Sequence, residues 1–165
     1  MIEDTVRKNG YLSLGSRLKR IGERLQADVQ AVIDDYGFPI QAHHYNLFFA
    51  LDENGPLEIG QLARALGISQ PGVTRSVGHL RAADCVRIAV SNRDKRVRRV
   101  ELTEQGEEIL RVGRREIGPR LLLGFDEIFK AHEGELLPLL GILEDALSEA
   151  TLAEIADRRE KGVKA

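Results

Sequence analysis

Apolar residues recur at intervals of three and four along the first part of the chain, the spacing of one face of an α-helix. This pattern predicts a long amphipathic helix over residues 11–36, which Gly37 and Pro39 end. A shorter helix is predicted over residues 43–51, followed by a turn at residues 54–56. The apolar positions of the first helix are Leu14, Leu18, Ile21, Leu25, Val29 and Val32.

Two helices separated by three residues are predicted in the middle of the chain. The first has an apolar face from Ile59 to Leu66 and ends at Gly67, where a positive φ angle is easily adopted. Ser69 is suited to cap the second helix, and Pro71 lies near its start, where a missing N–H costs little. We expect this second helix to extend to about Ala83.

The spacing of apolar residues then changes to strict alternation, which is typical of β-strands. The segments 86–90 and 97–102 both alternate, so they predict a β-hairpin. Its turn, residues 91–96, is polar and carries the cations Arg93, Lys95 and Arg96. Thr103 is expected to cap the helix that follows.

The last third of the chain is predicted to be helical, with interruptions. We expect a kink at Gly118-Pro119, a break at residues 132–134 and fraying in the charged tail from residue 157 to 165. Leucines at 136, 140, 143 and 147 form a seam suited to packing against another helix. This seam would serve either the core of the chain itself or an interface between two copies. The small core expected between the two terminal stripes favours the interface.

These elements predict a mainly α fold with a small β-hairpin wing. A helix, a three-residue turn, a second helix and a hairpin in this order are typical of a winged helix-turn-helix. We predict a winged helix-turn-helix domain over residues 37–106. Residues 1–36 and 107–165 are expected to supply N- and C-terminal dimerisation helices.

Charge is unevenly distributed along the chain, although its formal net charge is only -2. The segment from Arg64 to Arg99 holds nine basic and two acidic residues, so its charge is +7 and the remainder carries -9. A nucleic-acid backbone responds to local potential, so the segment is suited to bind phosphates. A solvated arginine-rich surface has the same composition, and charge alone does not separate the two.

Residues at the start of the second central helix are suited to contact double-stranded DNA. In a helix-turn-helix this helix enters the major groove, where Gln70 is suited to adenine and Arg75 to guanine. Ser69 and Thr74 are suited to hold phosphates, and Gly72 leaves room for a close approach to the DNA backbone. The cations of the hairpin turn are expected to reach the minor groove.

The stretch from Leu57 to Gly106 resembles the MarR (multiple antibiotic resistance regulator) family of winged-helix transcription factors. The resemblance includes Gln61-Leu62-Ala63 and the run from Ser69 to Arg75. Asp94-Lys95-Arg96 is similar to the family's Asp-Arg-Arg, and residues 102–106 are similar to its Leu-Thr-x-x-Gly. About a third of the chain is covered, and the flanking helices match the family's layout only.

This resemblance implies a transcriptional regulator that acts as a homodimer on a near-palindromic operator and represses its targets. The lack of an apolar signal core or membrane span predicts a cytoplasmic location. The resemblance also implies release by a small-molecule effector, and in the wing it implies that Asp94 braces Arg96, which enters the minor groove. Two departures matter. Lys95 replaces an arginine, which lowers geometric specificity, and Asp84 stands where the family usually has glycine, so a strained turn is expected.

Several polar residues have more than one interpretation. Cys85 is expected to be a buried structural thiol rather than a redox sensor, and a single cysteine excludes an intramolecular disulfide. The spacing of His43 and His44 does not suit a metal site. One of the two is instead a candidate to line an effector pocket between the first two helices and the dimer core. His79 is expected to contact phosphate or to lie at the surface. No metal and no cofactor are expected.

Other classes of protein are weighed against a DNA-binding regulator. No apolar run approaches the length of a membrane span, and no apolar signal core begins the chain. Nucleophile-elbow, Walker and dinucleotide-binding motifs are missing from the sequence, so an enzyme is not expected. RNA binding is disfavoured because A-form major grooves do not admit a helix. The alternative is a winged-helix protein–protein interaction module, which would need an apolar reading face.

Overall fold

The computed structural model describes residues 3–90 and 98–163, and the chain divides into two compact units. We call Met1–Leu121 the N-terminal unit and Leu122–Ala165 the C-terminal unit. Helix α7 (Gly118–Phe129) begins in the first unit and continues into the second. The two units are defined by how compactly the chain is folded, whereas the predicted domains are defined by DNA binding and dimerisation. The predicted domain boundaries therefore stay a prediction.

The N-terminal helices begin with a short irregular segment. Helix α1 (Thr5–Lys8) and the 3-10 turn η1 (Gly10–Ser13) precede the long helix α2 (Leu14–Asp35). The sequence predicts that this helix starts at residue 11, and this prediction is wrong by three residues. Gly10 has a φ of 55°, outside the right-handed helical region, so the α-helical hydrogen-bond pattern starts only beyond it.

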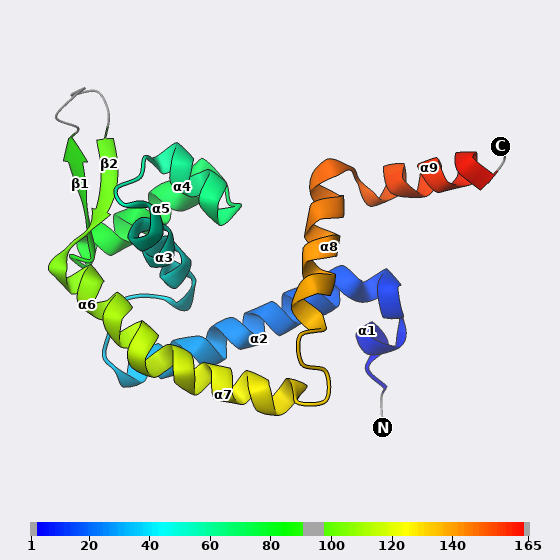
Figure 1. Cartoon of the computed structure of the whole chain (residues 1–165), viewed down its shortest axis with the longest axis horizontal. Coiled ribbons are helices and arrows are strands. Elements are labelled where there is room, and N and C mark those ends of the chain that lie inside the picture. Colours follow the sequence, from blue (N-terminus) through cyan, green and yellow to red (C-terminus); the bar gives the residue numbers. More distant parts are fainter. Residues whose placement is uncertain (1–2, 91–97, 164–165) are drawn as a thin grey trace. The chain divides into compact units, whose positions relative to one another are not determined.

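Three helices and a hairpin form the centre of the N-terminal unit (Figure 1). The 3-10 turn η2 (Ala42–His44) leads into α3 (Tyr45–Asn54), which Gly55 ends with a φ of 71°. The helix predicted over 43–51 is thus present, but it begins as a 3-10 turn and continues to Asn54. Helices α4 (Ile59–Leu66) and α5 (Gln70–Ala82) follow, separated by the predicted three-residue turn.

The two strands pair as the alternation predicts. Strands β1 (Val86–Val90) and β2 (Arg98–Leu102) are antiparallel, with Val86 opposite Leu102. Leu57 extends this ladder, because its N–H donates to the Val100 carbonyl at 3.1 Å and its carbonyl accepts from the Val100 N–H at 2.7 Å. The residue predicted to start the second strand, Val97, lies outside the described residues. The backbone of the turn before α4 therefore holds the base of the hairpin.

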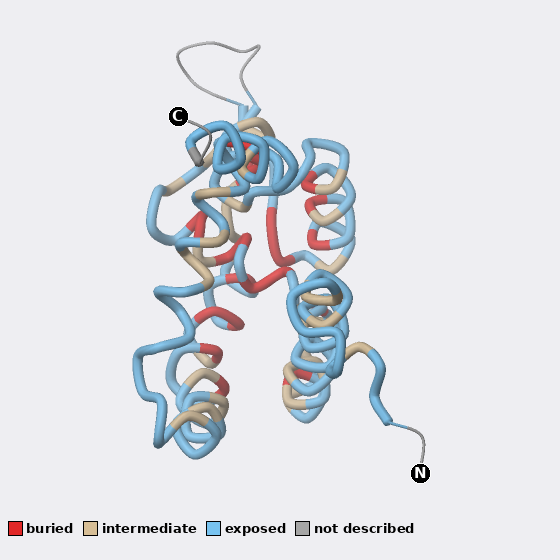
Figure 2. The backbone as a smooth tube through the Cα atoms, turned by 90° about the vertical axis from the view of Figure 1, so that its right-hand side faces the viewer, coloured by how far each residue is buried: buried red, intermediate tan, exposed pale blue. Residues whose placement is uncertain are grey.

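A single hydrophobic cluster joins these elements. Helix α3 contacts α4, β2 and α6 (Glu104–Val112), so its apolar side lies at the middle of the cluster. The red segments of Figure 2 mark the buried residues along the chain. The largest completely buried side chains are Phe48, Ile33, Leu47, Leu62, Leu80 and Ile109.

A π-helical turn replaces the predicted kink in the helix that follows the hairpin. Thr103 caps α6, and the π turn η3 (Gly113–Ile117) then connects α6 to α7. The interruption begins at Gly113, five residues before the expected Gly118, because the Gly118 N–H bonds back to the Gly113 carbonyl. Gly113 also lies against the Tyr45 ring, which a Cβ atom at this position would overlap.

The C-terminal unit contains the rest of α7 and the helices α8 (Leu136–Glu149) and α9 (Leu152–Val163). Gly134, with a φ of 76°, lies in the predicted break. The expectation that the tail frays from residue 157 is wrong, because α9 continues to Val163. Thr151 and Glu154 cap this helix reciprocally: the Thr151 N–H donates to the Glu154 carboxylate at 2.8 Å, and the Glu154 N–H donates to the Thr151 hydroxyl at 3.3 Å.

Candidate DNA-binding surface

The start of helix α5 is fixed by local interactions. Gly67 adopts the left-handed conformation, with a φ of 64°, and ends α4. The Ser69 hydroxyl then accepts a hydrogen bond from the Gly72 N–H at 3.3 Å, as the sequence predicts for a cap. Since the cap uses a lone pair of Ser69, its O–H remains available as a donor to a phosphate.

Helix α5 has one buried and one exposed face. Val73, Val77 and Leu80 are buried in the core, which fixes the rotation of the helix. Three of the predicted reading residues, Gln70, Thr74 and Arg75, are exposed on the other face. The Thr74 hydroxyl donates to the Gln70 carbonyl at 2.9 Å, so its proton is engaged while its lone pairs can still accept. The exposed face of α5 is therefore polar, and Gln70 and Arg75 extend from it.

His79 lies further along α5, where the helix approaches the histidines of the α2–α3 connection. His79 is exposed, and its ring centroid lies 6.3 Å from that of His44. The His43 and His44 rings are 4.2 Å apart. His44 is buried, with 3% of its surface exposed, so the structure joins His79 to a group of three rings.

The buried His44 is held in its neutral form. Burial lowers its pKa to about 4, with smaller contributions from His43 and His79. Its Nδ1 accepts a hydrogen bond from the Gln41 N–H at 3.1 Å, which makes the neutral ring carry its proton on Nε2. Nε2 has no hydrogen-bond partner among the described residues. Burial also lowers the pKa of His43.

The predicted effector residues do not border the cavities that the structure describes. Neither His43 nor His44 lines the larger cavity beside α6 or the smaller one beside α3. His44 instead packs at the edge of the core. Their role in an effector pocket stays a prediction.

The described part of the hairpin carries further cations. Arg93, Asp94, Lys95 and Arg96 lie outside the described residues. The exposed Arg98 and Arg99 stand at the start of β2, opposite Val90 and Ala89, so they point to opposite faces of the hairpin. We add Arg98 and Arg99 to the candidate DNA-binding residues. The sequence signal was present, because both belong to the basic segment and directly follow the predicted turn.

Arg87, at the base of the hairpin, is committed to a different contact. Its Nε donates to the Glu101 carboxylate at 2.6 Å, and this hydrogen bond raises the pKa of Arg87. The two residues face each other across the ladder. Arg87 therefore contributes less free positive charge to DNA than the sequence count suggests.

The end of α5 and the start of α6 are joined at one point. Asp84 adopts the left-handed conformation, with a φ of 54°, as its departure from the family's glycine predicts. Its carbonyl accepts a hydrogen bond from the Thr103 hydroxyl at 2.5 Å. The Thr103 N–H donates to the Cys85 carbonyl at 3.1 Å, and the Gly106 N–H donates to the Thr103 hydroxyl at 3.2 Å. The strained turn is thereby held by the cap of the next helix.

Cys85 is buried beside this junction. None of its surface is exposed, and its thiol donates to the Ala83 carbonyl at 3.3 Å. Burial raises the pKa of the thiol, so the reactive thiolate is disfavoured. The expectation of a buried thiol is confirmed.

Two apolar surfaces lie outside the core, one in each unit. On α2, the stripe Leu18, Ile21 and Leu25 is exposed, although the end of the same helix is buried at Ile33. In the C-terminal unit, α7 and α8 expose large apolar residues over most of their length. These residues are Leu122, Leu123, Ile128, Leu136, Leu137, Leu139, Ile142 and Leu147. Exposed apolar surface of this extent is typical of an interaction surface.

Within residues 3–90 and 98–163, no group of three or more His, Cys, Asp or Glu side chains is arranged to hold a metal ion. Across the same residues, no helix combines the length and the apolar composition needed to cross a bilayer.

Comparisons with known proteins place this arrangement in a family. The sequence model of the MarR family matches residues 36–97. The HTH-type transcriptional regulator PetP of Rhodobacter capsulatus is 30% identical over 118 residues, which cover 64% of this chain and 69% of PetP.

Solved structures show the same fold at low sequence identity. The transcriptional regulator BldR of Sulfolobus solfataricus is similar with a TM-score of 0.63 and 20% identity, over 90% of this chain and 100% of BldR. The PcaV regulator of Streptomyces coelicolor, solved in complex with its natural ligand, is similar with a TM-score of 0.67 and 15% identity, over 91% of this chain and 99% of PcaV. The chain belongs to the MarR family of winged-helix, DNA-binding transcriptional regulators.

Proposed function

We propose that this regulator binds a specific sequence of double-stranded DNA as a homodimer, represses its targets and releases DNA when a small molecule binds. One observation carries the DNA-binding part. Helix α5 is anchored in the core by Val73, Val77 and Leu80 and presents a polar face with Gln70 and Arg75. A protein–protein module would instead need an apolar reading face, so this polar face favours DNA.

In this proposal the residues at the start of α5 have two different roles, base contacts and phosphate contacts. Gln70 and Arg75 read base edges, while Ser69 and Thr74 hold phosphates and Gly72 permits close approach. His79 contacts phosphate near the end of the helix. The turn residues Arg93, Asp94, Lys95 and Arg96 act in the minor groove, with Asp94 bracing Arg96. Arg98 and Arg99 add positive charge at the start of β2, one on each face of the hairpin.

Dimerisation is supported by the exposed apolar residues of α2, α7 and α8. A second copy of the chain is the partner that would cover both stripes in the same way on each protomer. Two recognition helices related by twofold symmetry contact half-sites about 34–36 Å apart, one turn of B-DNA. The operator is therefore expected to be near-palindromic.

Effector release is supported by the natural ligand with which PcaV was solved, and His43 and His44 are the residues that we propose for the effector pocket. A ligand releases DNA only if it binds the DNA-free arrangement more tightly than the DNA-bound one. Titration of operator affinity with candidate small molecules tests this part. An affinity that stays constant throughout contradicts it.

Selection of bound sequences from a random pool of duplex DNA tests the central proposal. The expected result is a near-palindromic motif with half-sites one helical turn apart. Arg75→Ala should relax the preference at one base pair of each half-site by about 1–3 kcal/mol. Arg24→Ala, which removes a cation from α2, is the matched control and should leave the motif unchanged. No enriched motif, or the same motif with Arg75→Ala, contradicts the assignment.

Arg96→Ala separates phosphate and minor-groove contacts from base reading. It should weaken binding to all sequences and reduce the dependence of affinity on salt by about one unit of slope. Unchanged affinity and unchanged salt dependence contradict a role for the hairpin turn in DNA binding.

A further inference from the structure

One face of helix α3 contacts the α6–η3 segment that follows the hairpin. Tyr45, Phe49 and Asp52 recur at intervals of four and three residues, so they share this face of the helix. The Tyr45 hydroxyl donates to the Ile109 carbonyl of α6 at 3.3 Å. The Asp52 carboxylate pairs with Arg114 of η3, with 2.6 Å between the nearest oxygen and nitrogen. The two segments are therefore joined by side chains as well as by the core.

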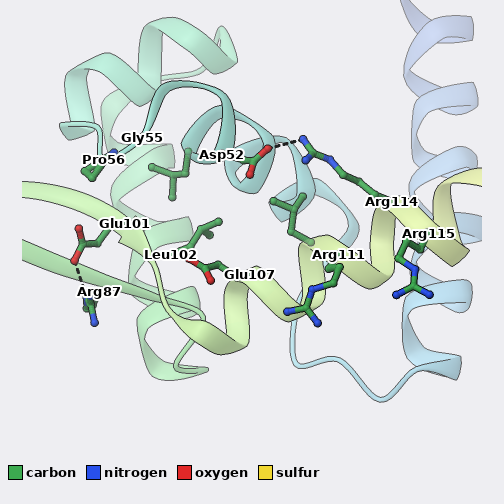
Figure 3. Close-up of a pocket in the computed structure, with 12 residues that line it drawn as sticks. Asp52, Gly55, Pro56, Arg87, Glu101, Leu102, Glu107, Arg111, Arg114 and Arg115 are labelled. Atoms are coloured by element: carbon green, nitrogen blue, oxygen red, sulfur yellow. Dashed lines mark hydrogen bonds and ion pairs between the residues drawn. The ribbon is translucent and has the colours of Figure 1, made fainter.

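Arg114 is held by two groups of α3 at once. Its guanidinium carbon lies 5.6 Å from the centroid of the Phe49 ring, a cation–π distance, while its Nη2 contacts the Asp52 carboxylate. Figure 3 shows Arg114 extending toward Asp52, whereas Arg111 and Arg115 extend away from it. A guanidinium that stacks on a ring and also pairs with a carboxylate is fixed in direction as well as in distance.

Arg114 lies within the π turn η3, where the helix that follows the hairpin is interrupted. The Gly118 N–H bonds to the Gly113 carbonyl in this turn, so the α-helical hydrogen-bond pattern is broken between α6 and α7. Helices bend most readily where this pattern is broken. The contact of Arg114 with α3 is therefore made at the position where a bend would change the angle between α3 and the start of α7.

The elements on the two sides of this contact have different roles in the proposed function. On one side, Phe48 of α3 and Val77 of α5 are buried in the same cluster, so α3 and the recognition helix α5 belong to one packed body. On the other side, Arg120 at the start of α7 pairs with Asp35 of α2 at 3.4 Å. Helix α2 carries the exposed apolar stripe that we assign to the dimer interface. The angle at η3 therefore affects the position of α5 relative to α2.

We propose that Arg114 is a positioning residue for operator recognition, which sets the distance between the two recognition helices of the dimer by holding η3 against α3. This inference rests on the proposed function, because it needs a dimer that binds two half-sites. Arg114 acts through Asp52 and Phe49 and does not itself contact DNA. The residues of α5 then determine the sequence of each half-site, and Arg114 determines the spacing between the two half-sites.

Loss of the Arg114 contact should change the spacing preference and leave the fold intact. The Arg114 and Asp52 side chains are 49% and 37% exposed, and ion pairs this exposed contribute little to global stability. One inserted base pair moves a half-site by about 3.4 Å and also rotates it about the DNA axis. A protein without the contact bends at η3 more easily, so arrangements that fit such an altered operator become more populated.

Binding of the full chain to operators with altered spacers tests the proposal. The probes are the operator that the wild type selects from random duplex DNA and two versions with the spacer shortened or lengthened by one base pair. We expect the wild type to bind the altered operators at least about tenfold more weakly, and Arg114→Gln to bind all three within about threefold. The preferred half-site sequence should be the same for both proteins. A wild-type spacing preference in Arg114→Gln overturns the proposal.

Charge reversal distinguishes positioning from a general loss of stability. Asp52→Arg places two cations together and should relax the spacing preference as Arg114→Gln does. Combining Asp52→Arg with Arg114→Asp restores an ion pair with exchanged partners, so the double variant should recover most of the preference. Arg115→Gln, at a neighbouring side chain that extends away from Asp52, is the matched control and should bind as the wild type does. Equal relaxation in Arg115→Gln, or no recovery in the double variant, overturns the assignment.

The sequences that the wild type selects separate this inference from the proposed function. Paired half-sites with one fixed spacer, together with several tolerated spacers for Arg114→Gln, support both. Paired half-sites that the wild type binds equally well at every spacer overturn the inference and leave the proposed function intact. A wild type that selects no paired half-sites contradicts the proposed function and the inference with it.

Discussion

In the N-terminal unit eighteen apolar residues are buried in one cluster, whereas in the C-terminal unit Ala150 is the one buried residue among those described. Both units are nevertheless built from amphipathic helices. In the first, helices of different direction and a hairpin cover each other's apolar faces. In the second, leucines and isoleucines of α7 and α8 remain exposed. The comparison indicates that the first unit carries its own stability and that the second depends on a covering surface.

The largest effect is expected from a change in the centre of the N-terminal core. Phe48 has no exposed surface, so Phe48→Ala should lower the free energy of unfolding by about 3–5 kcal/mol. Urea denaturation measures this loss. The control Leu152→Ala, at a residue 71% exposed in the C-terminal unit, should change stability by less than about 0.5 kcal/mol. Equal losses of unfolding free energy for the two variants would contradict the conclusion that the N-terminal unit carries its own stability.

The next effect concerns the exposed face of α8. Leu139→Glu combined with Ile142→Glu, at residues 63% and 67% exposed, should raise the dimer dissociation constant at least about a hundredfold, or about 2.7 kcal/mol. Helix content should be retained, because neither residue is buried within the chain. Sedimentation equilibrium measures the constant, and Glu144→Gln is the control on the same helix. A dimer that withstands the double variant shows that this face is not the interface.

Acid should destabilise the N-terminal unit through His44. Its pKa of about 4 in the folded protein lies below the ordinary 6.5, so the unfolded chain binds the proton more tightly. Stability contributed by the neutral ring is complete above pH 6.5 and falls as the pH decreases toward 4, by about 3 kcal/mol in all. His44→Asn should flatten the dependence in this range. Denaturation at several pH values measures it, and an unchanged slope contradicts the role of His44.

The smallest effect compares two threonine caps. Thr103→Ala should cost about 1 kcal/mol of global stability, because Thr103 caps α6 and also binds the Asp84 carbonyl. Thr151→Ala removes a cap of the same kind from α9, where little is packed, and should only shorten that helix. Denaturation and circular dichroism distinguish the two. Equal global losses would mean that α9 is part of the cooperative core.

Features with local causes were predictable from the sequence. The turn between α4 and α5 follows from Gly67 and Ser69, and the hairpin follows from alternation, because each signal acts within a few residues. Thr103 was identified as a cap for the same reason. The polar face of α5 was predictable as well, because the spacing of the apolar residues defines the opposite face of the helix.

Features that depend on distant residues were not predictable. Asp52 and Arg114 are far apart in the chain, so the ion pair between them leaves no local pattern in the sequence. The Tyr45 ring likewise lies against Gly113, at the start of the π turn, although the two residues are far apart in the chain. The burial of His44 did have a signal, because residues 44, 47, 48 and 51 share one face of a helix. Burial of His44 leaves the predicted role of the two histidines in an effector pocket untested.

The junction at Asp84 and Thr103 has a mechanical consequence. Asp84 precedes the hairpin and Thr103 follows it, and the Thr103 hydroxyl donates a hydrogen bond to the Asp84 carbonyl. The Cys85 N–H binds the Leu80 carbonyl at 2.8 Å, and the Cys85 carbonyl receives the Thr103 N–H. Hydrogen bonds thus connect the last turn of α5 directly to the first turn of α6. In the proposed DNA complex, we therefore expect a tilt of α6 to turn α5 and to change the angle at which α5 meets the major groove.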